Sequence, residues 1–427
     1  MQVHIRKARV IDPQSAYHEK VVDLLVEDGV IKNIAGTIKP GAADIVISAK
    51  GLCVSPGWVD VFADYRDPGF EHKETIGSGM AAAAAGGFTD VLLVPNTQPV
   101  LSTKSIIQYV LQQAKGHAVR LHPIGAATQN AEGKDLAEML DMHSSGALTF
   151  SDGWKPVQNA GLMLKALEYV KAFSGNIIQL PVDMALSAGG LMNEGIVSTT
   201  LGIAGIPALA ETIMVHRDIE LLRYTGSKLH ITGVTTAESV EMIRNAKAEG
   251  LSITCSVTPY HLALNDELLS GYDSIYKVMP PLRGEDDRMA LIAGVQDGTI
   301  DCIASHHRPH EWDAKAKEFE YAGDGMAVQE VAFNILWDAL HEYIDIDRLT
   351  EMMTVIPRDI FGMEPQAIAK GGKACLTLFS AEGNYMPADS ELKSVSRNNP
   401  FTGKELAGKV IGIVNNGMAY LNEQAGI

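Results

Sequence analysis

Short apolar runs alternate with longer amphipathic runs through the middle of the chain. Apolar runs of this length, bounded by turn residues, predict buried strands, and the longer runs with a helical period predict helices. We expect strands at residues 89–94, 119–124, 147–150, 177–180, 228–232, 252–257 and 302–305. We expect helices at residues 76–85, 102–113, 134–142, 162–173, 206–224, 237–249 and 288–296. This repeated order predicts a parallel sheet of the α/β class, which we interpret as a closed (β/α)8 TIM barrel.

Both ends of the chain carry a different pattern, made of short strand-like runs joined by turn residues. Asp28-Gly29 stands between two apolar runs near the start, and Asn415-Asn416-Gly417 follows one near the end. Asp-Gly and Asn-Gly next to apolar runs are strong signals for a β-hairpin. We therefore predict that residues 1–54 and 365–427 fold together into a small β-sandwich domain, and that residues 55–364 form the barrel.

Composition and charge limit the classes of partner. The chain has 427 residues, of which 46 % are hydrophobic and 20 % are charged, which is typical of a globular protein with a large core. Lys and Arg number 35 against 52 Asp and Glu, which gives a net charge of −17 spread along the chain. A strongly acidic protein repels phosphate backbones and anionic lipids, so nucleic acid and membrane partners are disfavoured.

The cysteines and the N-terminus favour a cytoplasmic protein. The four cysteines stand far apart without a Cys-x-x-Cys pair, so we expect buried, reduced thiols (Cys53, Cys255, Cys302 and Cys375). The first residues read as a strand with charges inside it, which is unlike a signal peptide. No stretch is apolar over enough residues to cross a bilayer.

Several specific strings stand at the predicted strand ends. Residues 54–69 read Val-Ser-Pro-Gly-Trp-Val-Asp-Val-Phe-Ala-Asp-Tyr-Arg-Asp-Pro-Gly. Further strings follow in order: Val94-Pro-Asn-Thr97, Phe150-Ser-Asp152, Val257-Thr-Pro-Tyr-His-Leu262, Lys277-Val-Met-Pro-Pro-Leu-Arg283 and Ala304-Ser-His-His-Arg-Pro-His310. Together they resemble the long-chain bacterial dihydroorotases of the amidohydrolase superfamily, over nearly the whole chain. The resemblance implies hydrolysis of a cyclic amide, dihydroorotate to carbamoyl aspartate, in pyrimidine biosynthesis.

The resemblance also implies one or two zinc ions held at the strand ends, yet most of the matching positions have lost their ligands. Zinc supplies hydroxide at neutral pH by lowering the pKa of a bound water from about 15.7 to about 7. Phe62 and Asp64 stand at the positions of the family's His-x-His pair. Leu180 and Gly233 stand at the positions of two further ligand histidines. The family's general-base aspartate, in Ala-Thr-Asp-His-Ala-Pro-His, is replaced by His306.

Only Asp64, Asp152 and His306 remain as possible ligands, which is fewer than a sound catalytic zinc site needs. We therefore expect no metal and no dihydroorotase turnover, and we assign no catalytic residue. The alternative is an active zinc-dependent cyclic amide hydrolase whose altered site uses these three side chains.

The substrate-anchoring positions are partly kept. The resemblance assigns Arg66 and Asn96 to the grip on the substrate carboxylate and His310 to a nearby binding position. Two other positions depart from the family: Met279 stands where the family has asparagine, and Tyr260 stands where it has histidine. A guanidinium can hold a carboxylate in a bidentate manner, so a small carboxylate ligand stays open. The other interpretation is that Arg66 forms an ion pair with Asp64 or Asp152.

A family role exists for such a protein. Some bacteria carry an inactive dihydroorotase homologue that assembles with aspartate carbamoyltransferase and supports its architecture. We expect a comparable structural or regulatory role here, with that transferase as the candidate partner. Homodimers are common among relatives, so we also expect a homo-oligomer.

Overall fold

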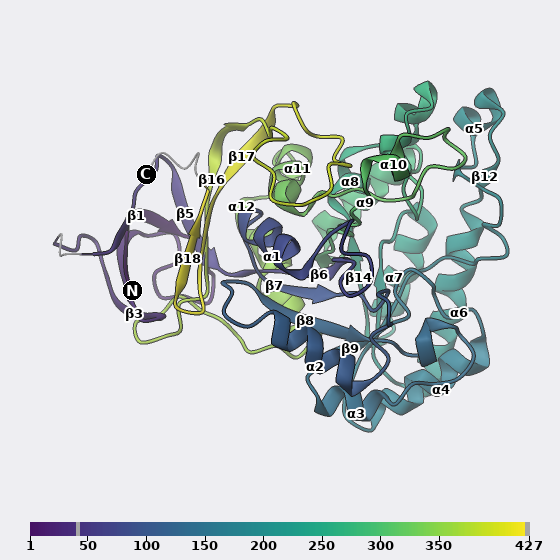
Figure 1. Cartoon of the computed structure of the whole chain (residues 1–427), viewed down its shortest axis with the longest axis horizontal. Helices are drawn as coiled ribbons and strands as arrows, with labels where there is room; N and C mark the ends of the chain where they lie inside the picture. Colours follow the sequence, from purple (N-terminus) through teal and green to yellow (C-terminus); the bar gives the residue numbers. More distant parts are fainter. Residues whose placement is uncertain (40–42, 423–427) are drawn as a thin grey trace.

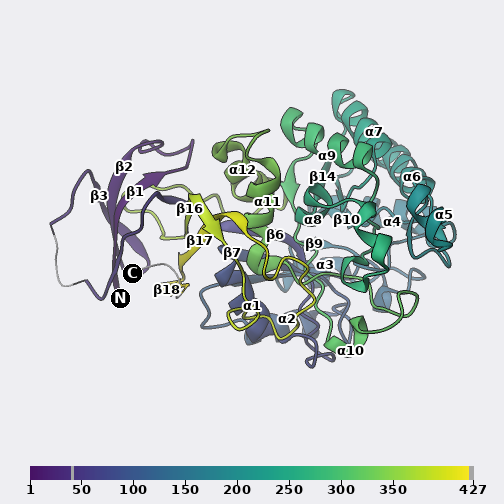
Figure 2. The same ribbon diagram turned by 90° about the horizontal axis from the view of Figure 1, so that it is seen from above.

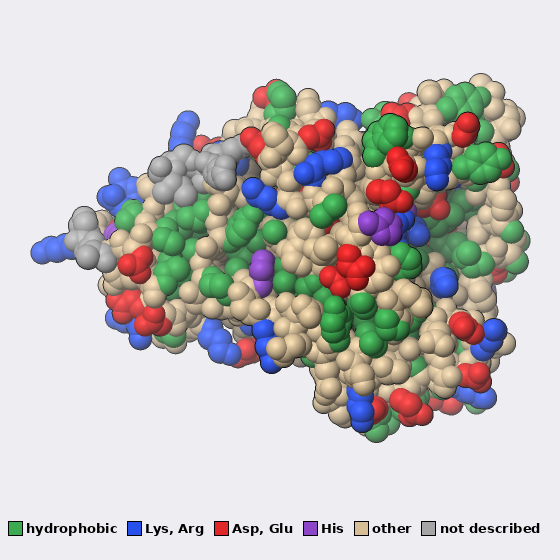
Figure 3. All heavy atoms as spheres, viewed as in Figure 1, with side chains coloured by type: hydrophobic (Ala, Val, Ile, Leu, Met, Phe, Trp, Pro, Cys, Tyr) green, Lys and Arg blue, Asp and Glu red, His purple; other side chains and the backbone are tan. Residues whose placement is uncertain are grey.

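The computed structural model describes residues 1–39 and 43–422. Two parts follow one another along its longest axis, a β-sheet built from both ends of the chain and a larger barrel ringed by helices (Figures 1 and 2). Acidic and basic side chains are interspersed on the face shown in Figure 3. Among the described helices, none has the length and apolar character that crossing a membrane requires.

Eight parallel strands form the barrel in the order β15-β14-β13-β10-β9-β8-β7-β6. Their bounds are β6 (Trp58–Ala63), β7 (Phe88–Leu93), β8 (Arg120–Gly125), β9 (Thr149–Phe150), β10 (Ile177–Gln179), β13 (Leu229–Thr232), β14 (Ile253–Val257) and β15 (Cys302–Ile303). A parallel bridge between Ala63 and His307 joins the two edges, and the Asp64 N–H donates to the His307 carbonyl at 2.9 Å. The predicted (β/α)8 barrel is confirmed.

The helices cover the outside of this sheet and the loops at its mouth (Figure 2). They are α1 (Ile76–Ala85), α2 (Lys104–Gln113), α3 (Met139–Ser144), α4 (Ala160–Lys171), α5 (Ile196–Leu201), α6 (Leu209–Thr225), α7 (Ala237–Ala248), α8 (Pro259–Ala263), α9 (Glu285–Asp297), α10 (Trp312–Lys315), α11 (Ala332–Leu340), α12 (Ile346–Met353) and α13 (Val355–Ile360). A pair of two-residue strands, β11 (Met192–Asn193) and β12 (Gly205–Ile206), lies in the loop before α6.

Two helices begin three or more residues after their predicted starts. The helix expected from residue 134 begins at Met139, because Thr128 and Leu136 form a bridge that turns this segment back after β8. The helix expected from Ile206 begins at Leu209, because Ile206 pairs with Asn193 in the small two-stranded sheet. In both places a local strand contact replaces the first helical turn.

The terminal sheet has the order β18-β17-β16-β5-β1-β2-β3, and β4 also pairs with β1. Its strands are β1 (Gln2–Val10), β2 (Val21–Glu27), β3 (Val30–Ala35), β4 (Ile45–Ile47), β5 (Leu52–Pro56), β16 (Leu376–Tyr385), β17 (Leu406–Asn415) and β18 (Met418–Leu421). Both predicted hairpins are present, with Asp28 at φ 48° and Asn416 at φ 52°, each followed by a glycine with positive φ. Strands from both ends of the chain thus share one sheet, while the exact domain boundaries stay a prediction.

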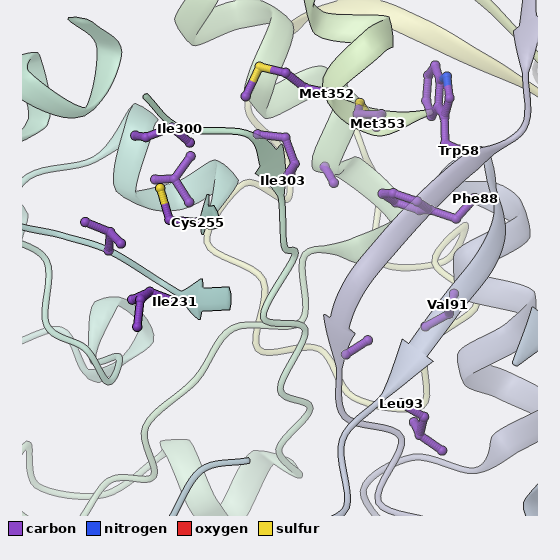
Figure 4. Close-up of a cluster of buried hydrophobic side chains, with 14 of the residues drawn as sticks. Trp58, Phe88, Val91, Leu93, Ile231, Cys255, Ile300, Ile303, Met352 and Met353 are labelled. Carbon is purple, nitrogen blue, oxygen red and sulfur yellow. The ribbon is translucent and has the colours of Figure 1, made fainter. Parts of the chain in front are cut away.

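A continuous apolar core joins the barrel to this sheet. Trp58, at the start of β6, packs against Phe88, Phe333 of α11 and Phe379 of β16, with ring centroids 5.0–6.3 Å apart. Figure 4 shows Trp58 and Phe88 in the same cluster as Met352 and Met353 of α12. Burial of several aromatic rings at this junction fixes the barrel against the terminal sheet.

A buried charge network holds the amino-terminal end of the barrel. Asp90 on β7 accepts hydrogen bonds from Arg120 and His122 of β8 and from Arg358 of α13, each at 2.8 Å at its shortest. Arg358 also donates to the carbonyl of Gly57, between β5 and β6. Burial alone would raise the pKa of Asp90, but these partners hold it well below its ordinary value.

We predict that Arg358→Met lowers the free energy of unfolding by about 2 kcal/mol, because it removes a buried, charge-assisted hydrogen bond. Urea unfolding followed by circular dichroism measures this change. Arg223→Ala, which breaks an ion pair on the exposed face of α6, is the matched control and should change stability by about 0.5 kcal/mol or less. Equal effects of the two variants would contradict the role of the network.

Candidate functional site at the barrel mouth

The residues expected at the active site lie at the carboxyl ends of the barrel strands. In Figure 1 the arrows of β7 and β8 point away from the terminal sheet, so this mouth opens at the far side of the barrel. Asp64 follows β6, Asp152 follows β9, Leu180 follows β10, Gly233 follows β13, and His306 follows β15. The sequence therefore placed these positions around one mouth, as expected for this fold.

Aromatic side chains fill the centre of the mouth. The His306 ring lies 4.8 Å from the ring of Phe62 and 5.2 Å from the ring of Trp154, and Phe62 lies 5.1 Å from Trp154 (centroid distances). Phe62 and His306 are fully buried, and so is Leu180. Phe62, Trp154 and His306 thus form one aromatic cluster, and Leu180 is buried as well.

Gly233 provides the space that His306 occupies. A Cβ atom at Gly233 would lie 2.5 Å from Cε1 of His306, and the glycine has a φ of +72°, which side chains rarely adopt. The His306 imidazole is held by a 2.8 Å hydrogen bond between its Nε2 and Oγ1 of Thr232. His306 itself has a φ of +46°, so the segment after β15 is held in a left-handed turn. A side chain at position 233 and the His306 imidazole would therefore compete for the same space.

Both surviving carboxylates are engaged within the chain. Asp64 Oδ2 accepts a hydrogen bond from the indole N–H of Trp154 at 2.8 Å and lies 3.3 Å from Nε of Arg66. Asp152 accepts hydrogen bonds from the backbone N–H of Thr128 at 2.9 Å and from its hydroxyl. These interactions use the oxygen atoms that a metal would need.

Burial shifts the pKa of two titratable groups at the mouth. Burial raises the pKa of Asp152 above its ordinary value despite the hydrogen bonds from Thr128. Burial also lowers the pKa of His306 well below its ordinary value, and the positive charge of Arg308 lowers it further, so His306 is neutral. His306 keeps one buried nitrogen, Nδ1, without a partner among the described residues.

The residues present do not fit a catalytic zinc ion. Zinc in a hydrolase requires three protein ligands that converge on one point, with a fourth position open to water. Asp64, Asp152 and His306 do not converge in this way. Within residues 1–39 and 43–422, three ligating side chains come close enough to share an ion only at His18, Glu19 and Asp347, far along the chain from the mouth residues.

The predicted substrate-binding residues lie at the mouth, but each contacts other parts of the chain. Arg66 is paired with Asp64, which agrees with the ion-pair interpretation. The Asn96 side chain donates to the backbone carbonyl of Asp152 at 3.0 Å and accepts a hydrogen bond from the backbone N–H of Trp154 at 2.8 Å. His310 contacts Nζ of Lys73 through Nδ1 and the carbonyl of Asp324 through Nε2. Asn96 therefore positions the 152–154 loop, and a role of these residues in ligand binding stays a prediction.

Two residues at the mouth were missed from the sequence. Trp154 closes the cluster, and its ring lies 4.6 Å from the guanidinium carbon of Arg308. The signal was present, because Trp154 stands where the Phe-Ser-Asp-Asp-Gly string has glycine, and Arg308 stands where Ala-Thr-Asp-His-Ala-Pro-His has alanine. Both side chains are larger than the glycine and the alanine of those strings.

Comparison with known proteins assigns the family. The family model of dihydro-orotase-like proteins matches residues 51–239. The dihydroorotase of Geotalea daltonii is 40 % identical over 410 residues, which cover 96 % of each chain. The chain belongs to the dihydroorotase family. The dihydroorotase of Acetivibrio thermocellus is also 40 % identical, over 98 % of this chain and 99 % of its own.

Solved structures of hydantoinases share the fold. The L-hydantoinase from Arthrobacter aurescens superposes with a TM-score of 0.86 at 22 % identity, over 99 % of this chain and 96 % of its own. A D-hydantoinase from a Thermus species gives a TM-score of 0.80 at 19 % identity. At this low sequence identity the likeness is one of fold, and it covers both the barrel and the terminal sheet. The fold of the family thus extends over nearly the whole chain.

We predict that Gly233→Ala lowers the free energy of unfolding by about 2 kcal/mol, because the new methyl group meets His306 and the backbone must keep a positive φ. Thermal and urea unfolding measure the loss. Gly250→Ala is the matched control, because Gly250 has a φ of +83° with open space around its Cβ position. A loss no larger than that of the control would show that His306 does not fill the space at Gly233.

Stability is expected to fall as the pH is lowered below about 6.5, because the unfolded chain then protonates histidines that stay neutral in the folded protein. His306→Gln removes one such group. Between pH 7.5 and pH 5.5 this variant should therefore lose about 1.4 kcal/mol less than the wild type. Urea unfolding at the two pH values tests this, with exposed His341→Gln as the control. Identical pH dependence of wild type and His306→Gln would contradict a buried, neutral His306.

Proposed function

We propose that this dihydroorotase-family protein of pyrimidine biosynthesis is catalytically inactive and serves a structural or regulatory role. The observation that carries the proposal is the packing at the mouth, where Phe62, Trp154 and His306 occupy the centre and Gly233 makes room for them. A filled mouth offers no place for a metal-bound hydroxide beside a substrate carbonyl.

Chemistry leads to the same conclusion. Hydrolysis of a cyclic amide at neutral pH needs an activated water and a polarised carbonyl, both of which zinc supplies in such hydrolases. His306 replaces the aspartate that acts as general base in the family, and its Nε2 is engaged by Thr232. Each 1.4 kcal/mol of lost transition-state stabilisation is about a factor of ten in rate, so loss of the metal alone abolishes useful turnover.

The partner we propose is aspartate carbamoyltransferase. Support for this comes from membership of the dihydroorotase family and from a fold that is intact over its full described length although the mouth has changed. The fold itself does not fix the activity, so a surface of the same fold remains available for a partner. Co-purification of the transferase with this chain under gentle lysis is the expected result, and its absence from the purified complex would contradict this partner.

The inactive state is tested by elemental analysis of protein purified without chelators or a metal-binding tag. We expect less than about 0.1 zinc per chain, because the three required ligands do not converge. We also expect no hydrolysis of dihydroorotate above the uncatalysed rate, with or without added zinc.

The alternative, an active zinc hydrolase with an altered site, gives the opposite results. One or two zinc ions per chain and a rate that falls in Asp152→Ala would establish it and overturn the proposal. Glu132→Ala is the control carboxylate for that measurement, because Glu132 is exposed and its side chain pairs with Lys134 on the surface.

A further inference from the structure

A stripe of exposed apolar side chains runs along α6, on the outside of the barrel. Leu209, Ile213 and Tyr224 are 55 %, 43 % and 78 % exposed, and the helical period places all three on one side of the helix. Most other apolar residues of α6 are buried, and the helix packs against α4 and α7. A helix on the surface of a globular protein usually exposes charged and polar residues, so this stripe departs from the ordinary pattern.

The turn after Asp183 extends the stripe at the start of α6. The backbone N–H of Asp183 donates to the carbonyl of Ala210 at 2.8 Å, so this turn lies against the first turn of the helix. Figure 2 shows α6 at the end of the barrel far from the terminal sheet. The turn adds two side chains that are 49 % and 40 % exposed, Met184 and Leu186. We call the combined surface the α6 face, formed by Met184, Leu186, Leu209, Ile213 and Tyr224.

The α6 face carries little charge in a protein whose net charge is −17. Residues 172–215 contain no Lys or Arg and only three acidic residues, of which Glu211 is buried. Glu220, farther along the stripe, is paired with Arg223. Two copies of a strongly acidic protein repel each other, so they associate at least cost through a surface of low net charge.

The order of residues along the stripe allows it to pair with the same stripe on a second copy. A twofold axis next to His216 would place two α6 helices antiparallel, with residues at equal distances from the axis opposite each other. Leu209 and Tyr224 stand equally far from that axis in opposite directions, so each would contact the other across the interface. Near the axis, His216 of one copy would come within reach of Glu220 of the second copy. Apolar ends and a polar centre thus complement themselves.

We propose that the α6 face is the interface of a homodimer of this chain. A specific interface buries about 800 Å² per partner, and five large apolar side chains that are 40–78 % exposed supply a large share of it. A contiguous apolar surface on a globular protein marks a contact with a partner. The expected homo-oligomer is thereby assigned to a specific surface. This surface lies outside the mouth, so the dimer does not depend on the proposed loss of catalysis.

Sedimentation velocity of the full chain over a range of protein concentrations tests the dimer. We expect the wild type to be dimeric. Ile213→Asp should raise the Kd of the dimer at least about tenfold, because the interface would have to bury a carboxylate. Trp312→Asp is the matched control and should leave the Kd unchanged, since Trp312 is an apolar side chain of α10 that is 79 % exposed and lies outside the α6 face.

A cross-link locates the interface by a second route. All four native cysteines are buried, so a short bismaleimide reacts with an exposed cysteine introduced by substitution. His216→Cys should give a cross-linked dimer in denaturing electrophoresis, because the twofold axis brings the two new thiols together. Trp312→Cys should stay uncross-linked under the same conditions.

Three outcomes would overturn the α6 interface. They are a monomeric wild type at every concentration, a dimer whose Kd is equal in Ile213→Asp and Trp312→Asp, and a dimeric His216→Cys variant that does not cross-link. None of them concerns catalysis, because these substitutions leave the mouth unchanged. Bound zinc and hydrolysis would overturn the proposed inactive role, and the dimer interface would still stand.

Discussion

The arrangement of the mouth depends on one steric relation, that between His306 and Gly233. The His306 imidazole lies where a Cβ on Gly233 would otherwise be, and it contacts both Phe62 and Trp154. A histidine at position 233 and a histidine at position 306 are mutually exclusive in this geometry. Once His306 is in place, the cluster closes, and Trp154 takes the oxygen of Asp64 that faces it. The packing at the mouth therefore depends on these residues together.

Much of the fold could be predicted from the sequence because it follows from local patterns. Alternating apolar and amphipathic runs gave the barrel, and Asp28-Gly29 and Asn416-Gly417 gave both terminal hairpins, because φ > 0 is required at those positions. The helix starts near residues 134 and 206 were wrong for one reason. Each depends on a short strand contact directly before the helix, Thr128 with Leu136 and Asn193 with Ile206, and hydrophobic periodicity does not predict such a contact.

For the site, the sequence could predict only which positions lack a metal-binding side chain. Comparison of strings identified Phe62, Leu180 and Gly233 as positions without a donor atom, and their places at the strand ends followed from the barrel. What fills the mouth depends on contacts between distant loops, such as those of Trp154 with Asp64 and with Arg308. Single-residue comparison does not show that a tryptophan after β9 will stack on an arginine after β15. Asn96 illustrates the same limit, because it holds the loop that carries Trp154.

The most direct test of a mouth closed to metal is an anomalous-scattering map, recorded at the zinc edge from crystals of the full chain soaked in zinc. The account predicts no anomalous peak among Asp64, Asp152 and His306, with the His306 ring in contact with Phe62 and Trp154. A peak within coordination distance of those three side chains, about 2.0–2.2 Å, would contradict it.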